Sequence, residues 1–170
     1  YFIDAGMDAV DGVAARYFDQ CSELGRILDM LSDRMGTLVL YMVIAQQDPS
    51  IWGICAFLIV LDIVSHWCQM YVSLASGKAS HKGSENAWLN FYYNGPWVLF
   101  VACSGNELFI MLYYMLNTPQ YASSSILVNL ALFCFPIFVY KQIMNVVQLA
   151  HNLNKLVALD VKSSVDEKSD

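Results

Sequence analysis

The sequence predicts an all-α protein, a polytopic bundle of transmembrane helices, and three observations support that fold class. Apolar residues make up 57% of the 170-residue chain and charged residues only 14%, against about 25% charged residues in ordinary globular chains. The apolar residues are gathered in blocks near the roughly 20 residues that a helix needs to cross a bilayer. Segments with lysine or arginine also alternate along the chain with segments that have neither.

Four long apolar segments account for most of the chain. Before them, residues 1–16 read as the end of a further helix that begins upstream. The predicted spans then follow in order at 25–46, 51–76, 96–116 and from 123 past Tyr140 to about His151. We therefore expect about four complete spans and the end of another.

The two ends of the chain differ in character. We expect a membrane domain at 1–160 and a polar cytosolic tail at 161–170, where "SSVDEKSD" (163–170) has a composition that favours disorder. No initiator Met opens the chain, and no signal peptide is visible. We expect an N-terminally truncated chain that lacks its first helix.

The distribution of basic residues predicts the orientation of the spans. The turns at 46–50 and 117–123 have no lysine or arginine, whereas the loop at 77–95, the tail and the stretch 8–34 all do. The positive-inside rule places those three basic segments in the cytosol. Aromatic residues near the span ends are expected to be interfacial anchors: Trp52, Trp67, Trp88, Trp97, Tyr92 and Tyr93.

Two classes of function are disfavoured by composition. Nucleic-acid binding needs a basic patch, which the sequence does not contain. The five cysteines are scattered and form no C-x-x-C pair, so neither a zinc site nor a disulfide framework is indicated. We expect the cysteines to behave as small hydrophobic residues.

The stretch "DAVDGVAARYFDQCSELGRILDMLSD" (8–33) holds paired aspartates. Asp8 and Asp11 are three residues apart, and Asp29 and Asp33 are four apart, so each pair shares one face of a helix. If the two helices converge, the four carboxylates repel one another unless cations neutralise them. Ligation by oxygen alone suits Mg²⁺ or Mn²⁺.

Small residues and an arginine accompany the aspartates. Gly12 lets the backbone approach a ligand closely, and the planar guanidinium of Arg16 suits a diphosphate. Carboxylates, metal and arginine together indicate phosphoryl transfer at the membrane surface. One alternative is a solvated helix end whose acids pair with nearby arginines. A second is a path for divalent cations, although transport sites usually lie near the bilayer midplane.

The same stretch matches the pattern D-x2-D-G-x2-A-R-x8-G-x3-D-x3-D at every defined position. On this pattern the chain is identified as a member of the CDP-alcohol phosphotransferase family, integral membrane enzymes with six spans. Four further stretches resemble its eukaryotic phosphatidylinositol synthase branch: "ILDMLSDR", "LDIVSHW", "SHK" at 80–82 and "GNELF" at 105–109. The similarity extends to about Asp160.

The resemblance implies a reaction and residue roles. The phosphatidyl group of CDP-diacylglycerol would pass to myo-inositol, giving phosphatidylinositol and CMP. By position, Asp8, Asp11 and Asp29 resemble ligands of a two-metal Mg²⁺ or Mn²⁺ centre, and Asp33 resembles both a ligand and the general base. The CDP-diacylglycerol contacts would be Gly12, Arg16 and Ser22. The resemblance also implies a homodimer and an endoplasmic reticulum membrane with the site facing the cytosol.

The positions of the arginines bear on the identity of the acceptor alcohol. All three arginines, at 16, 26 and 34, lie within the motif stretch or directly after it, so a neutral polyol fits better than a phosphorylated acceptor. Glycerol phosphate, serine or choline remain alternatives, as does an inactive fragment. We hypothesise that His81, Lys82 and Glu107, with Ser80 and Asn106, shape the inositol pocket; ordinary packing and an ordinary loop are the alternative.

Two ionisable residues lie within the second predicted span. Asp62 and His66 lie four residues apart in an apolar segment. Ionisable residues inside a membrane are functional candidates by default. We nevertheless expect them to pair with each other or with the motif helices.

Overall fold

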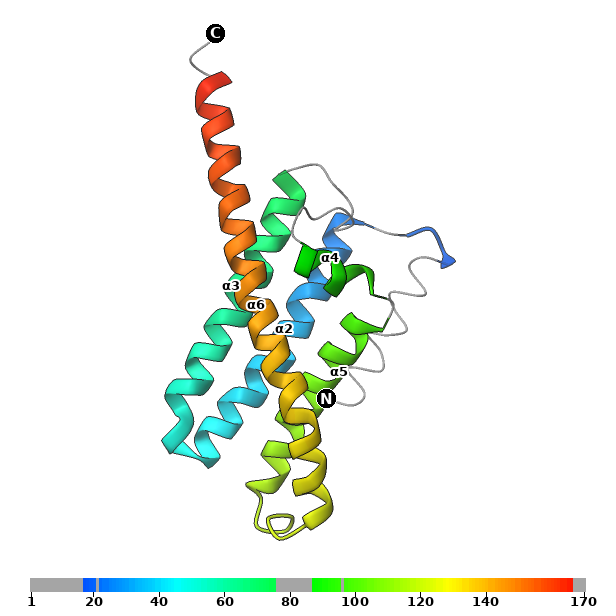
Figure 1. The fold of residues 1–170 in the computed structure, drawn as a ribbon, viewed down its shortest axis with the longest axis vertical. Helices are drawn as coiled ribbons and strands as arrows, with labels where there is room; N and C mark the ends of the chain where they lie inside the picture. The colour runs from blue at the N-terminus through cyan, green and yellow to red at the C-terminus, as the bar shows by residue number, and fades with distance from the viewer. Residues whose placement is uncertain (1–16, 21, 76–86, 96, 167–170) are drawn as a thin grey trace.

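The computed structural model describes residues 17–20, 22–75, 87–95 and 97–166, and within these ranges the regular structure is entirely helical (Figure 1). The all-α prediction is therefore confirmed. The elements, in chain order, are α2 (Glu23–Gln47), a single 3₁₀ turn η1 (Pro49–Ile51), α3 (Trp52–Ala75), α4 (Ala87–Asn94), α5 (Val98–Leu116) and α6 (Ser125–Asp166).

Three helical segments in this part of the chain are long and apolar enough to cross a membrane: Pro49–Ala75, Val98–Leu116 and Ser125–Val161. They correspond to the predicted spans at 51–76, 96–116 and 123–151. The predicted span at 25–46 does form a helix, α2, but it is not among the three. The charged residues in its first half make it less apolar than the others.

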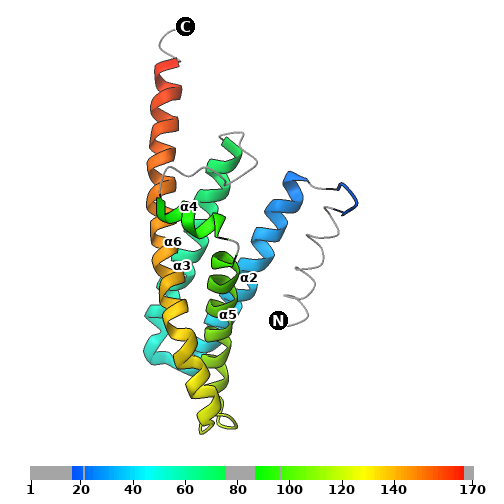
Figure 2. The same ribbon diagram turned by 45° about the vertical axis from the view of Figure 1, so that its right-hand side comes forward.

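The helices run alternately up and down, as the pattern of basic residues predicts. The turns after α2 and after α5 lie at one end of the bundle (Figures 1 and 2). The beginning of α2, the end of α3 and the short helix α4 lie toward the opposite end, and the last part of α6 projects beyond them. The lysine- and arginine-free turns thus lie far along the bundle from the described basic residues near the start of α2 and the end of α6, such as Arg26 and Lys155.

Helix α4 lies where the sequence predicted only a loop between 77 and 95. Leu89 and Tyr92, three residues apart, are buried, while Trp88 and Phe91 are exposed. Leu89 and Tyr92 pack in one cluster with Ala102 of α5 and Met144 of α6. A short helix of this kind is stabilised by tertiary packing rather than by local propensity, which is why its sequence pattern alone did not predict it.

Helix α6 is longer than predicted. The expected end was near His151, followed from 163 by a disordered tail, but the helix continues to Asp166. No glycine or proline follows Pro136, so nothing in the sequence interrupts the helix once it has formed. Extending an existing helix costs far less than starting one. Residues 163–166 of the predicted tail are therefore helical, and 167–170 lie outside the described residues.

The apolar core is divided between the two ends of the bundle. Toward the charge-poor turns, Tyr41 and Ile44 of α2 pack with Cys55 and Leu58 of α3 and with Ile110 of α5. The α4 cluster forms the other core, and a smaller cluster joins α5 to α6. The four tryptophans are exposed, as interfacial anchors would be, but Tyr92 is only 2% exposed and is a core residue instead.

Candidate functional site

The motif helix α2 begins at a side-chain cap. The hydroxyl oxygen of Ser22 accepts a hydrogen bond from the backbone N–H of Gly25, 2.9 Å away. Glu23 in the first turn adds negative charge at the positive end of the helix dipole. The sequence analysis assigned Ser22 to the diphosphate. The structure gives its oxygen a capping role, which still leaves the hydroxyl hydrogen able to donate.

The two described aspartates of the motif lie one turn apart on α2. Asp29 is exposed, and the side chain of Asp33 is 39% exposed. Two accessible carboxylates on one helical face are hard oxygen donors of the type that Mg²⁺ and Mn²⁺ prefer. The donor chemistry of α2 therefore fits the metal that the family implies.

The rest of the predicted metal centre lies outside the described residues. Asp8 and Asp11 belong to that part of the chain, as do the predicted CDP contacts Gly12 and Arg16 and three of the predicted pocket residues, Ser80, His81 and Lys82. Among the residues that are described, no group of three or more His, Cys, Asp or Glu side chains comes together to hold a metal. Helix α2 thus carries two of the four predicted ligands, and the four-carboxylate centre remains a prediction.

Arg34 lies between two carboxylates. Its Nη1 is 3.1 Å from both carboxylate oxygens of Asp62 on α3, and its Nη2 is 3.4 Å from Oδ2 of Asp33. The Arg34 side chain is 16% exposed and the Asp62 side chain 12%. The expectation that Asp62 pairs with a motif helix is confirmed. An ion pair between two helices links the motif directly to a membrane span.

Helix α6 contributes the next contact to Asp62. The side-chain amide of Asn145 donates to Oδ1 of Asp62 over 3.3 Å, and Asn145 is only 1% exposed. His66 Nδ1 lies 3.5 Å from the same oxygen and 2.8 Å from the backbone carbonyl of Asp62, which confirms the predicted pairing of these two residues. The ammonium of Lys141 donates in turn to Oδ1 of Asn145 over 2.5 Å.

These α6 residues were missed by the sequence analysis, although the sequence holds a signal for them. Buried polar side chains recur along the helix at intervals of four, three and four residues, at Lys141, Asn145, Gln148 and Asn152. That spacing places them on one helical face. Unpaired polar groups inside an apolar bundle are costly, so such a stripe indicates polar partners on the facing helix.

Further along this face, Gln148 joins α6 to α3 and α4. Its side-chain N–H donates to the backbone carbonyl of Ser65 over 3.2 Å, and its Oε1 lies 2.8 Å from the hydroxyl of Tyr93. That hydroxyl is also 3.1 Å from Oε1 of Gln69. Burial raises the pKa of Tyr93 above its ordinary value of 10.0, so the phenol remains a donor at neutral pH. Tyr93 is therefore an internal hydrogen-bonding residue rather than an interfacial anchor.

The "GNELF" segment (105–109) contributes in part to the packing between helices. Asn106 is buried on α5, and its Oδ1 accepts a hydrogen bond from Nε2 of Gln142 over 2.8 Å. Glu107, the next residue, is partly buried. The contact of Asn106 is the helix-packing role that was weighed as the alternative, whereas the predicted role of Glu107 in an inositol pocket stays a prediction.

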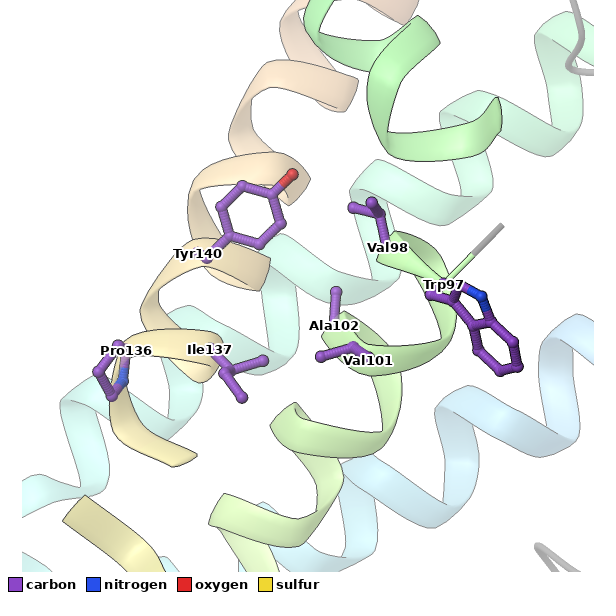
Figure 3. A pocket seen from close by; sticks show the side chains of 7 residues that line it. All are labelled: Trp97, Val98, Val101, Ala102, Pro136, Ile137 and Tyr140. Carbon is purple, nitrogen blue, oxygen red and sulfur yellow. The ribbon is translucent and has the colours of Figure 1, made fainter. Parts of the chain in front are cut away.

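An open pocket with a volume of about 430 Å³ lies between α5 and α6 (Figure 3). The side chains that line it are apolar apart from the indole nitrogen of Trp97 and the hydroxyl of Tyr140. The lining residues are Trp97, Val98, Val101, Ala102, Pro136, Ile137 and Tyr140. A hydroxylated or charged headgroup would lose its hydrogen bonds to water there without replacement. This pocket is therefore a poor candidate for the binding site of the alcohol or the diphosphate.

The fold and the acidic helix together define a class: an all-helical integral membrane protein with a carboxylate-bearing motif at the start of one helix. Comparison with known sequences agrees with this class and narrows it. The model of the CDP-alcohol phosphatidyltransferase family matches residues 1–153. The chain belongs to this family of phosphotransferase enzymes.

Several curated relatives are similar over nearly the whole chain. Proteins named CDP-diacylglycerol–inositol 3-phosphatidyltransferase are 38% identical in Saccharomyces cerevisiae, over 93% of this chain and 72% of the relative, and 36% identical in Schizosaccharomyces pombe, over 95% and 78%. The human protein of that name is 32% identical over 99% of this chain and 82% of its own length. No solved structure matches the chain.

Proposed function

We propose that this chain transfers the phosphatidyl group of CDP-diacylglycerol to myo-inositol, with CMP as the second product. The observation that carries the proposal is the similarity to relatives named for this inositol reaction, which spans more than nine-tenths of the chain. The complete aspartate motif and the exposed position of Asp29 on α2 support the same chemistry.

The proposed reaction is a displacement at phosphorus. An inositol hydroxyl oxygen attacks the β-phosphorus of CDP-diacylglycerol and forms a new P–O bond. The bond from that phosphorus to the bridging oxygen breaks, and the bridging oxygen leaves with CMP. An alcohol is a poor nucleophile near neutral pH, so a positioned base is needed. The family resemblance assigns that role to Asp33, and the partly exposed carboxylate of Asp33 on α2 is compatible with it.

The residues proposed to hold the metals are Asp8, Asp11, Asp29 and Asp33, with Mg²⁺ or Mn²⁺ as the candidates. When bound, divalent cations would neutralise charge on the diphosphate and on the departing CMP. Gly12 and Arg16 are proposed to contact the CDP moiety, with Ser22 beside the diphosphate. The diacylglycerol chains would stay in the bilayer while the headgroup meets inositol at the membrane surface.

The proposed location is the endoplasmic reticulum membrane, with the motif facing the cytosol, and the proposed assembly is a homodimer. The charge pattern supports the orientation, since the two turns without lysine or arginine lie at the end of the bundle opposite the start of α2, which carries Arg26 and Arg34. The compartment and the dimer are supported by family resemblance alone.

The transport alternative is weakened by the contacts of Asp62, the acid buried within a membrane span. Its two oxygens already accept hydrogen bonds from Arg34 and Asn145. A cation path needs acidic oxygens that are open to the ion. The remaining alternative is another acceptor for the same transfer, such as glycerol phosphate, serine or choline.

An acceptor assay tests the proposal. Membranes carrying the chain are supplied with CDP-diacylglycerol, Mg²⁺ or Mn²⁺, and labelled inositol, serine, choline or glycerol phosphate in parallel. We expect label in lipid, and release of CMP, with inositol alone. Asp33→Asn is expected to lower turnover by a factor on the order of 10² to 10⁴ while CDP-diacylglycerol binding is retained.

Three results would contradict parts of this proposal. Incorporation of a different alcohol would change the acceptor, and no CMP release with any alcohol would remove the activity from this chain. Near-normal turnover of Asp33→Asn would remove its role as base. The proposed inositol pocket is tested separately by the inositol KM of Glu107→Gln and His81→Ala, because unchanged values in both variants would refute it.

A further inference from the structure

The guanidinium of Arg34 connects the proposed base to a neighbouring helix. One terminal nitrogen, Nη1, is 3.1 Å from both oxygens of Asp62, and the other, Nη2, is 3.4 Å from Oδ2 of Asp33. The guanidinium group is planar and rigid, so its two terminal nitrogens move together. The contact that holds Nη1 in place therefore also places Nη2, which donates to the Asp33 carboxylate.

Asp62 is itself held firmly. The residue is 8% exposed and lies on α3, where Oδ1 accepts from Asn145 on α6. Asn145 is fixed by the ammonium of Lys141 over 2.5 Å. Three helices, α2, α3 and α6, thus meet at this carboxylate. Removing one partner of a buried ion pair leaves the other charge uncompensated, so the contact resists rearrangement.

We propose that Asp62 is a positioning residue, which acts through Arg34 to hold the carboxylate of Asp33 at the angle needed to receive a proton from the attacking alcohol. This inference rests on the proposed function, in which Asp33 is the base. Helix α2 places the Cα of Asp33, and the contact with Arg34 restricts the rotamers of its side chain, which is 39% exposed.

The expected signature is a loss of kcat without a matching change in KM. Asp62 is not among the proposed substrate contacts, whereas misplacing a catalytic group by about 1 Å can cost about 10²-fold in rate. Asp62→Asn keeps the size of the side chain but removes its charge. We expect its kcat to fall about tenfold or more, with KM for inositol and CDP-diacylglycerol within about twofold of the parent values.

Arg34→Lys makes the same test from the other side of the contact. Lysine keeps the positive charge, but its ammonium is a single point that cannot hold two carboxylates in a fixed relative geometry. We expect a comparable fall in kcat while the protein remains folded. This variant also covers the case in which Asp62→Asn gives too little folded protein to assay.

A charge swap separates positioning from mere helix pairing. The double variant Arg34→Asp with Asp62→Arg restores an ion pair between α2 and α3, so its thermal stability should rise above that of Asp62→Arg alone. Its kcat should stay low, because position 34 would then place a second carboxylate beside Asp33. A purely structural ion pair would recover stability and turnover together.

Gln148→Met provides the matched control. It removes another buried contact between α6 and α3, the 3.2 Å hydrogen bond to the Ser65 carbonyl, and it does not touch Arg34. We expect a lower melting temperature and an unchanged kcat per folded enzyme. Melting in detergent is followed by circular dichroism for every variant, so that loss of fold is counted separately from loss of rate.

The outcomes distinguish this inference from the proposed function. Product formation by the parent chain in the acceptor assay establishes the reaction before any variant is compared. Values of kcat within twofold of the parent for both Asp62→Asn and Arg34→Lys would overturn the positioning role. A swap variant that regains full turnover would overturn it as well, and so would losses of rate that simply follow the melting temperatures.

Discussion

Single residues in the described part of the motif serve structure and chemistry together. Ser22 shows this most clearly, since its hydroxyl oxygen caps α2 while the family resemblance assigns the residue to the diphosphate. Arg34 is a second case, because it joins α2 to α3 and also contacts Asp33. At the scale of single residues, the sequence identifies candidate functional residues, while the structure shows which of their atoms already form hydrogen bonds or ion pairs.

Two substitutions at Ser22 separate capping from substrate binding. Ser22→Ala should destabilise the chain by about 1 kcal/mol, because the first turn of α2 loses its cap. Ser22→Asp keeps an equally good cap but places a negative charge where a diphosphate is proposed to lie. We therefore expect near-parental stability for Ser22→Asp with an increased KM for CDP-diacylglycerol.

Melting curves and the CDP-diacylglycerol KM of both variants check this prediction. The diphosphate contact would be refuted by an unchanged KM in Ser22→Asp. The capping role would be refuted by an unchanged melting temperature in Ser22→Ala.

At the scale of helices, small residues set how closely α5 and α6 approach. A Cβ atom on Gly105 would lie 2.6 Å from Cγ2 and 3.2 Å from Cβ of Ile137. Isoleucine is branched at Cβ and has one strongly preferred rotamer in a helix, so it cannot simply swing away. Close packing of helices through small residues is a common device in membrane proteins.

Gly105→Ala is expected to destabilise the bundle by about 1–3 kcal/mol through overpacking. Shortening the opposing side chain in the double variant Gly105→Ala with Ile137→Ala should recover part of that loss. Gly53→Ala is the control, because a Cβ there would meet nothing within 4 Å and alanine is a better helix former than glycine. Thermal unfolding in detergent measures all three. A Gly105→Ala variant as stable as Gly53→Ala would contradict the packing argument.

Helices were predicted well where the signal is local. The spans at 51–76 and 96–116 differ from α3 and α5 by no more than two residues at either end. Helix α4 and the extension of α6 were not predicted. The buried face of α4 is defined by Ala102 and Met144, which lie on other helices. A short amphipathic segment has no periodic signal long enough to reveal such a partner.

At the scale of the whole molecule, charge and topology agree. The lysine- and arginine-free turns lie at one end of the bundle, and the start of α2, α4 and the end of α6 lie toward the other (Figure 2). The arrangement brings the accessible carboxylates of α2 toward the same end as the described basic residue Lys155 of α6. A lipid substrate could then stay in the bilayer with its headgroup at that surface.

Cysteine labelling checks this topology. Gln120 and Lys155 are both exposed, the first in the turn before α6 and the second near the end of α6. In sealed vesicles whose outer surface is the cytosolic one, a membrane-impermeant maleimide should label Lys155→Cys directly. Gln120→Cys should react only after the membrane is permeabilised.

The parent chain, with its own cysteines, supplies the background labelling. Direct labelling of both positions would be inconsistent with a membrane-spanning α6. Direct labelling of Gln120→Cys alone would reverse the proposed orientation.

The sequence by itself determined the helical class, three spans, their alternating directions and the family. These properties depend on composition, on spacing within one segment and on a compact motif, all of which are local. Only the tertiary structure decided which groups meet inside the bundle. Asp62 and Asn145 are separated by 83 positions yet share a hydrogen bond, and Arg34 reaches Asp62 across 28. Packing selects such partners, because a buried charge must be paired and the pairing depends on how three helices are placed together.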